Sequence, residues 1–192
     1  MNIPLVKDTI DNSDIDKLVN WLKEGHRLTK GNVTIEFEKK WSEYLGTKHS
    51  VFLNSGSSAN LAMIYTLIQS GRLKNNNIIV PTVSWVTTVT PIIQLGLNPI
   101  LCDCDVDNLG LDIDHLNKLI LEHNPSVIML VHVLGIPNHM DEIIKLCKEN
   151  DIILIEDSCE SIGPARARGG DSRSHGTARH RHSNRLLQGK RA

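Results

Sequence analysis

The feature that most constrains the fold is a regular alternation of short apolar segments with longer amphipathic ones. The apolar segments that predict strands are residues 50–54, 77–81, 98–102, 126–131 and 152–156. The segments that predict helices between them are residues 57–70, 84–95, 112–123 and 139–149. Strands that helices cover on both faces are apolar along their whole length. The alternation therefore predicts an α/β domain with a mostly parallel sheet and flanking helices.

Two more helices are predicted ahead of this alternation. Residues 13–24 begin with a serine that can cap a helix, and apolar residues then recur at helical spacing. Residues 34–45 show a second amphipathic pattern, which ends at Gly46. The stretch between them, Leu28-Thr29-Lys30-Gly31-Asn32, breaks both patterns and predicts a loop.

Charge divides the chain into two parts, although the formal net charge is only −1. Residues 1–163 hold 13 Lys and Arg against 21 Asp and Glu, whereas residues 164–192 hold 8 against one. The second part has no aromatic residue, no Ile and no Val, so it cannot bury enough apolar surface to fold alone. We predict a folded domain over residues 1–163 and a separate basic tail over residues 164–192. The tail is either a disordered arm or the product of a frameshift.

Cysteine usage and the N-terminal sequence both point to a reducing compartment. The four cysteines do not form a disulfide framework in a chain of this length. The N-terminus lacks a basic segment followed by an apolar one, and no apolar run approaches the ~18 residues of a membrane span. We expect a cytoplasmic protein with no membrane partner.

The residues that follow the first predicted strand can bind an anion. Residues 54–60 have the sequence NSGSSAN, which places Gly56, Ser57 and Ser58 where the strand turns into a helix. Free N–H groups at a helix N-terminus and serine hydroxyls favour a phosphate. The alternative is a capped turn with no ligand, because Ser and Gly are common at such turns.

Two further predicted strands are followed by, or end in, residues that can contact a ligand. Trp85 follows the strand of residues 77–81, where an indole can stack on a planar ligand or pack as part of the core. Glu156 and Asp157 end the strand of residues 152–156. Asp157 can face a protonated ring nitrogen, or it can cap the next helix. Together, a phosphate site, a stacking ring and a carboxylate are the groups that hold pyridoxal phosphate (PLP).

Four sequence motifs in this order resemble the DegT/StrS-type family of nucleotide-sugar aminotransferases and sugar 3-dehydratases. They are NSGSSANL, VSWVTTVTPIIQLGLNPI, HVLGIPNHMD and IEDSCESIG, and the resemblance covers about residues 3–163. It implies the aspartate-aminotransferase-like fold (PLP fold type I), of which this chain has a truncated large domain. It also implies a homodimer, and a nucleotide-linked keto-sugar substrate used to make cell-surface polysaccharides or deoxysugars.

The resemblance also implies roles for individual residues. Ser57 and Ser58, beside Gly56, would hold the cofactor phosphate, Trp85 would stack on the ring, and Asp157 would bind the pyridine nitrogen.

The resemblance leaves the reaction open between two chemistries. Glu160 stands near the expected ring hydroxyl, where many members have Gln. That substitution fits either an aminotransferase or a dehydratase that uses pyridoxamine phosphate (PMP). The motifs NSGSSANL and TPIIQLGL favour the 3-dehydratase branch. His132 belongs to a His-x-x-Gly turn, which we expect to be structural.

A catalytic residue of the family is missing from the sequence. The resemblance implies a Lys that forms a Schiff base with the cofactor shortly after the IED motif, or a His in the dehydratase branch. Neither the segment that carries this Lys nor the segment that carries this His follows the IED motif here. The only lysine in the tail is Lys190. We therefore expect the chain as written to be inactive.

Two other function classes are less well supported. His175, His180 and His182, with the basic residues of the tail, offer a metal or nucleic-acid site, but no zinc-ligand spacing is present. We expect neither a metal nor nucleic acid as a ligand. A PLP-dependent lyase acting on amino acids is disfavoured only by the resemblance of the LTKGN and HVLGIPNHMD segments.

Overall fold

A computed structural model describes residues 9–161, and a four-stranded parallel sheet lies at its centre. The strands are β1 (Asn77–Pro81), β2 (Asn98–Cys102), β3 (Val127–Val131) and β4 (Ile153–Asp157). Their order across the sheet is β2-β1-β3-β4, and every neighbouring pair is parallel. The predicted α/β fold with a parallel sheet is confirmed.

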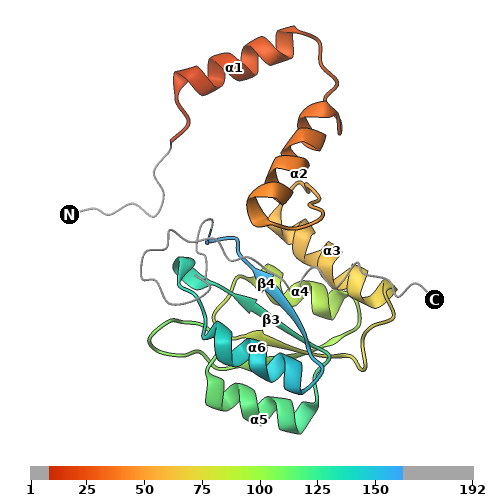
Figure 1. Cartoon of the computed structure of the whole chain (residues 1–192), viewed down its shortest axis with the longest axis vertical. Coiled ribbons are helices and arrows are strands. Elements are labelled where there is room, and N and C mark those ends of the chain that lie inside the picture. The colour runs from red at the N-terminus through yellow and green to blue at the C-terminus, as the bar shows by residue number, and fades with distance from the viewer. Residues whose placement is uncertain (1–8, 162–192) are drawn as a thin grey trace.

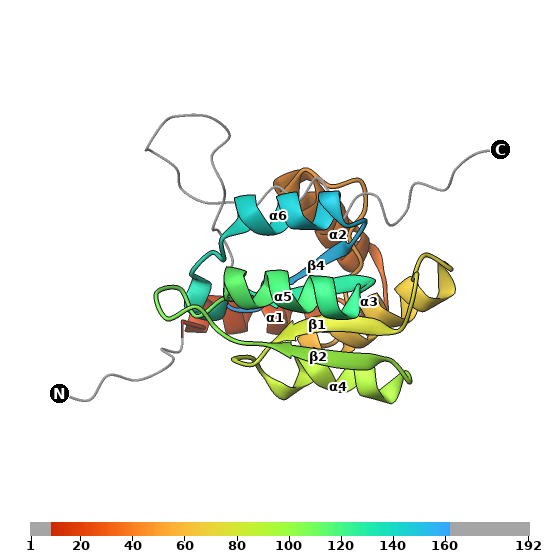
Figure 2. The same cartoon turned by 90° about the horizontal axis from the view of Figure 1, so that it is seen from below.

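Helices cover both faces of this sheet, as Figures 1 and 2 show. Helices α5 (Ile113–His123) and α6 (Met140–Glu149) lie on one face, and α3 (Gly56–Gln69) and α4 (Val86–Gln94) lie on the other. A short 3-10 turn, η1 (Val133–Gly135), follows β3. The layers bury the central strands β1 and β3 on both faces, which explains their continuous apolar runs.

In β1, β3 and β4, successive apolar residues enter different hydrophobic cores. Ile79 packs under α5 and α6, whereas Ile78 and Val80 pack against α3 and α4. All three side chains are fully buried. This alternation follows from the pleat, which sends neighbouring side chains to opposite faces.

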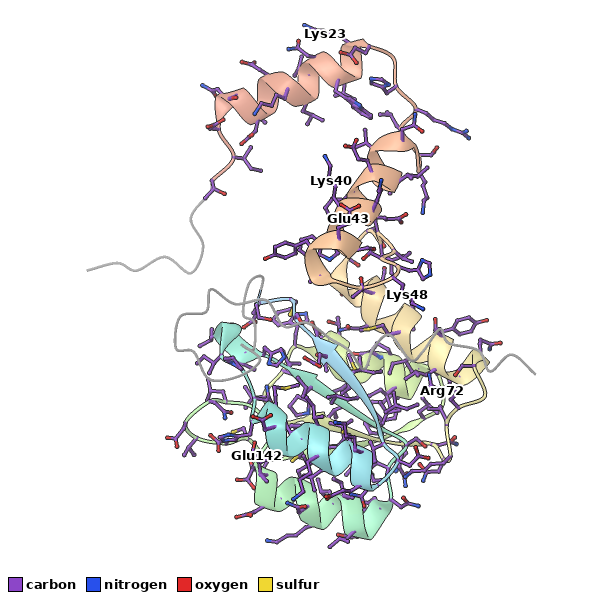
Figure 3. The ribbon with its side chains drawn as sticks, in the orientation of Figure 1. Lys23, Lys40, Glu43, Lys48, Arg72 and Glu142 are labelled. Carbon is purple, nitrogen blue, oxygen red and sulfur yellow. The ribbon has the colours of Figure 1, made fainter. Side chains whose placement is uncertain are left out.

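The first two helices project away from the sheet. Helices α1 (Asn12–Lys23) and α2 (Asn32–Leu45) form an arm in Figure 1. Figure 3 shows Lys23 at the end of α1 and Lys40 and Glu43 on α2. No residue of α1 is buried. The apolar residues of α1 that remain exposed are Ile15, Leu18, Val19 and Leu22.

The predicted strand at residues 50–54 is wrong. These residues form no strand, and Val51, Phe52 and Leu53 are exposed. The backbone N–H of Phe52 donates instead to Glu38 Oε1 at 2.9 Å. A strand needs a neighbour to satisfy its backbone groups, and no strand among residues 9–161 lies beside this segment.

Gly110 lies in a tightly packed loop after β2, and we expect Gly110→Ala to destabilise the fold. A Cβ there would overlap the buried side chain of Asn138 and lie 2.8 Å from Asn108 Oδ1. Neither amide can move freely, because Asn138 Oδ1 accepts from Leu111 N at 2.9 Å and Asn108 Oδ1 accepts from Gly110 N at 2.7 Å. Overpacking of this kind costs about 1–3 kcal/mol.

Thermal unfolding measures this effect. We expect the midpoint of Gly110→Ala to fall by roughly 3–10 °C. Gly56→Ala is the matched control for stability, because no atom lies within 4 Å of a Cβ at Gly56 and its φ is not positive. Equal midpoints for the two variants would show that the loop around Gly110 is less tightly packed than the structure indicates.

Candidate functional site

The carboxyl ends of the parallel strands all lie at one edge of the sheet, and the predicted site residues gather there. In α/β sheets, ligands bind outside this edge and beside the helix N-termini that follow the strands. β1 ends at Pro81, shortly before Trp85, and β4 ends at Asp157 itself. The N-terminus of α3 completes the group, because Asn60 in its second turn contacts Asp157.

The turn that opens α3 has the form of an anion site. Ser55 caps the helix, and its Oγ accepts from Ser58 N at 3.1 Å. The Ser55 hydroxyl also donates to Ser58 Oγ at 3.1 Å. Gly56 and Ser57 are exposed, and no atom lies within 4 Å of a Cβ built at Gly56. The first turn of α3 has no acidic residue, so no carboxylate there neutralises the partial positive charge of the helix N-terminus.

Trp85 is available to a ligand rather than buried in the core. It is the N-cap residue of α4 and follows directly on the loop from β1. Its relative exposure is 73%. A large aromatic side chain usually buries most of its surface, and this one does not do so within the described part of the chain.

Asp157 is held in a defined orientation. Its Oδ2 accepts from Asn60 Nδ2 at 2.8 Å, and its Oδ1 accepts from Cys159 N at 3.1 Å. The side chain is partly exposed, which leaves it accessible from the edge of the sheet. A carboxylate with two fixed oxygens can present a negative charge in one direction.

Asn60 is the residue of this site that the sequence did not reveal. It is 4% exposed, and its Nδ2 donates both to Asp157 Oδ2 at 2.8 Å and to Thr87 O at 3.3 Å. It therefore joins α3, α4 and β4. The only signal in the sequence was one polar residue among the apolar residues on the buried face of a predicted helix. A buried polar residue indicates a hydrogen-bond partner but does not identify it.

Two acidic side chains, Glu156 within β4 and Glu160 just after it, contact the segment that follows β3 at the border of the site. Glu160 Oε2 accepts from Leu134 N at 2.6 Å, which anchors the η1 turn. Glu156 Oε2 pairs with His132 Nε2 at 3.0 Å, and both side chains are buried. His132 thus contacts a neighbouring strand, in agreement with the structural role expected for it.

The thiol of Cys159 lies beside Asp157, which favours its neutral form. Partial burial, followed by a hydrogen bond to Asp157 and its negative charge, raises the pKa of the Cys159 thiol to about 11. A thiol is a weaker nucleophile than a thiolate, so this pKa does not favour Cys159 as a nucleophile at neutral pH.

Metal binding and membrane insertion have no support in the described residues. Residues 9–161 contain no group of three or more His, Cys, Asp or Glu side chains placed to hold a metal ion. None of their helices is both long enough and apolar enough to cross a bilayer. His175, His180 and His182 of the alternative metal site lie outside the described residues.

The comparison that decides the family is a match to a sequence profile. The profile of the DegT/DnrJ/EryC1/StrS aminotransferase family matches residues 9–180. The chain belongs to this family. The resemblance drawn from the four motifs is confirmed.

Among members of the DegT/DnrJ/EryC1/StrS family, this chain is similar to both dehydratases and aminotransferases. It is 37% identical over 179 residues to GDP-4-keto-6-deoxy-D-mannose 3-dehydratase of Yersinia pseudotuberculosis, over 92% of this chain and 45% of that one. It is 33% identical over 161 residues to UDP-4-amino-4-deoxy-L-arabinose–oxoglutarate aminotransferase of Shewanella sediminis, over 84% and 40%. The chain thus spans less than half the length of these relatives.

A solved family structure confirms the fold type. The Escherichia coli GDP-4-keto-6-deoxy-D-mannose 3-dehydratase with bound hydrated PLP superposes with a TM-score of 0.78 at 38% identity. The superposition covers 85% of this chain and 42% of the other. The chain therefore has the architecture of a truncated PLP fold type I large domain, as the sequence predicted.

Proposed function

We propose that this chain carries the cofactor-binding part of a PLP- or PMP-dependent enzyme that acts on a nucleotide-linked keto-sugar. The observation that carries the proposal is the convergence of three elements on Asn60: the anion-binding turn of α3, the helix capped by Trp85, and Asp157 at the end of β4. The relatives that act on GDP- and UDP-linked sugars support the substrate class.

The described residues fit this cofactor. Gly56, Ser57 and Ser58 would bind the phosphate at the open N-terminus of α3, and Trp85 would cover one face of the ring. Asp157 would keep the ring nitrogen protonated, and the second oxygen of Glu160 would face the ring hydroxyl. When bound, the cofactor supplies an electron sink, which stabilises the negative charge that develops on a substrate carbon when a bond to that carbon breaks. The protein contributes binding, orientation and charge.

Two reactions fit the site, and the relatives support both. In the aminotransferase reaction, an amine replaces the keto oxygen of the sugar. In the alternative, a PMP-dependent 3-dehydratase removes the hydroxyl at carbon 3. The dehydratase reaction is favoured by the 37% identity to the Yersinia pseudotuberculosis 3-dehydratase. The 32% identity to a lipopolysaccharide biosynthesis protein of Salmonella typhimurium supports a role of this chain in lipopolysaccharide biosynthesis.

We further propose that a protein made only of these 192 residues binds the cofactor but does not catalyse. Lys190 is the only lysine after β4. A lysine side chain in water is protonated at neutral pH, so it is a poor nucleophile unless a folded site desolvates it. The test is borohydride reduction of the PLP-loaded chain, which should leave no single lysine stoichiometrically labelled.

A chimera tests the activity itself. Residues 1–163 of this chain are joined to the C-terminal part of the Yersinia pseudotuberculosis relative. We expect the chimera to convert that enzyme's GDP-linked keto-sugar, and mass spectrometry of the product distinguishes a lost hydroxyl from a gained amine. The same chimera with Ser57→Asp is the control and should be inactive. A folded chimera that binds PLP but forms neither product would contradict the proposed function.

The assembly and location are also proposals. The exposed apolar residues of α1 support a homodimer, in which this surface packs against a second subunit. Sedimentation of the wild-type chain and of Leu18→Glu tests this, because a charge at Leu18 should yield monomers. The cysteines among the described residues are free thiols, which supports the cytoplasmic location expected.

The basic tail is proposed to take no part in binding. A chain that ends at Gly163 should bind PLP as tightly as the 192-residue chain, and neither should bind zinc or DNA. Loss of zinc or DNA binding on removal of residues 164–192 would instead support the metal or nucleic-acid alternative.

A further inference from the structure

Asn60 is a buried polar residue at a position that would ordinarily be apolar. It lies on the same face of α3 as Ile64 and Leu67, which are fully buried in the core below the sheet. A buried amide is costly unless its hydrogen-bonding groups are satisfied. Asn60 meets this condition through two acceptors, one on α4 and one on β4.

The acceptor on α4 is created by a proline. Pro91 lies inside α4, and a proline has no N–H to donate to the carbonyl four residues earlier. That carbonyl belongs to Thr87, and Asn60 Nδ2 donates to it at 3.3 Å. Pro91 therefore leaves the Thr87 carbonyl without a helical donor, and Asn60 supplies that donor. This hydrogen bond holds the Asn60 side chain in place.

The acceptor on β4 is the carboxylate of Asp157. Asn60 Nδ2 lies 2.8 Å from Asp157 Oδ2, whereas the other oxygen accepts from Cys159 N at 3.1 Å. Asn60 holds one oxygen, and the backbone and thiol of Cys159 also contact the carboxylate, so it cannot rotate freely about its Cβ–Cγ bond. Its direction is therefore set by a side chain that is itself anchored to α4.

We propose that Asn60 is a positioning residue that orients the Asp157 carboxylate toward the ring nitrogen of the cofactor, with Pro91 supplying the free carbonyl that anchors it. This inference rests on the proposed function, because it assigns Asn60 a role in the same site. Asn60 itself need not touch the cofactor. Its removal should weaken binding of the ring and leave binding of the phosphate group intact.

Equilibrium dialysis of the 192-residue chain tests the proposal with two probes, PLP and inorganic phosphate. We expect Asn60→Ala to bind PLP about tenfold more weakly, since a misdirected carboxylate loses much of a charge-assisted hydrogen bond. Its affinity for inorganic phosphate should be unchanged. Asn60→Leu removes the same donor but keeps a bulky side chain, and we expect the same loss of PLP affinity. It serves as the test variant if Asn60→Ala folds poorly. Asn117→Ala is the matched control, because Asn117 Nδ2 donates only within α5, to Ile113 O at 2.9 Å.

A double-mutant cycle separates positioning from a general loss of structure. In an Asp157→Ala background, adding Asn60→Ala should cause no further loss of PLP affinity, because no carboxylate remains to be oriented. An equal loss in both backgrounds would overturn the proposal, as would parent-like PLP affinity of Asn60→Ala and Asn60→Leu. If the parent chain itself binds no PLP, the proposed function fails, and this inference fails with it.

Discussion

Replacing Ser57 with Asp should reduce the affinity for PLP by at least ~30-fold. Ser57 lies in the first turn of α3, where the phosphate is proposed to bind. A carboxylate about 5 Å from a phosphate repels each negative charge of that phosphate by roughly 3 kcal/mol at an effective dielectric constant of about 20, and each ~1.4 kcal/mol is a tenfold change in affinity. Equilibrium dialysis with PLP measures the loss.

The fold should tolerate this change, which makes the result easy to interpret. An acidic residue in the first turn of a helix interacts favourably with the helix dipole, by about 0.3–1 kcal/mol. Ser57→Asp should therefore unfold at or slightly above the parent temperature. Ser13→Asp is the matched control, because Ser13 is also the second residue of its helix, α1, and is also exposed. If Ser57→Asp binds PLP as tightly as Ser13→Asp, the phosphate does not bind at the N-terminus of α3.

Replacing Asp157 with Ala should have the largest effect on turnover. Without this carboxylate, no group at the end of β4 would keep the ring nitrogen of a bound cofactor protonated, and the electron sink that the cofactor supplies would be weakened. In the chimera described above, we expect turnover to fall at least ~10³-fold, which corresponds to about 4 kcal/mol in the barrier. The affinity for PLP should fall by only about tenfold, since a charge-assisted hydrogen bond contributes about 1.5–3 kcal/mol.

The informative result is that Asp157→Ala should lose far more turnover than affinity for PLP. Asp16→Ala in the exposed helix α1 serves as the control for the loss of one negative charge, and it should change neither quantity. Turnover of Asp157→Ala within a few fold of the Asp16→Ala value would remove Asp157 from its assigned role. The measurements are steady-state kinetics on the GDP-linked keto-sugar and dialysis of the cofactor.

Most of the sheet was predictable because its strands are marked by local signals. The segment at residues 77–81 was predicted with the observed bounds, and that at residues 126–131 within one residue. Both are short apolar runs between turn residues, and both are buried on two faces. The segment at residues 50–54 has the same composition but forms no strand. Strand formation needs a neighbouring strand, and a sequence pattern does not report whether one is present.

The site was predictable only where its residues lie at the ends of elements. The turn at Gly56 and the carboxylate of Asp157 follow apolar runs, so their position at the sheet edge could be inferred. Asn60 could not be assigned, because its partner Asp157 lies 97 residues away. The contact of Glu160 with Leu134 N was likewise unforeseen, since it depends on the path of the η1 turn.

The most direct test of a cofactor site in this chain is the stoichiometry of PLP binding to the folded 192-residue protein, measured by equilibrium dialysis with inorganic phosphate as competitor. We predict saturation at one PLP per chain, displacement by phosphate, and quenching of tryptophan fluorescence that is lost in Trp85→Phe. Binding that does not saturate, or that phosphate does not displace, would contradict the assignment of this edge of the sheet as a PLP site.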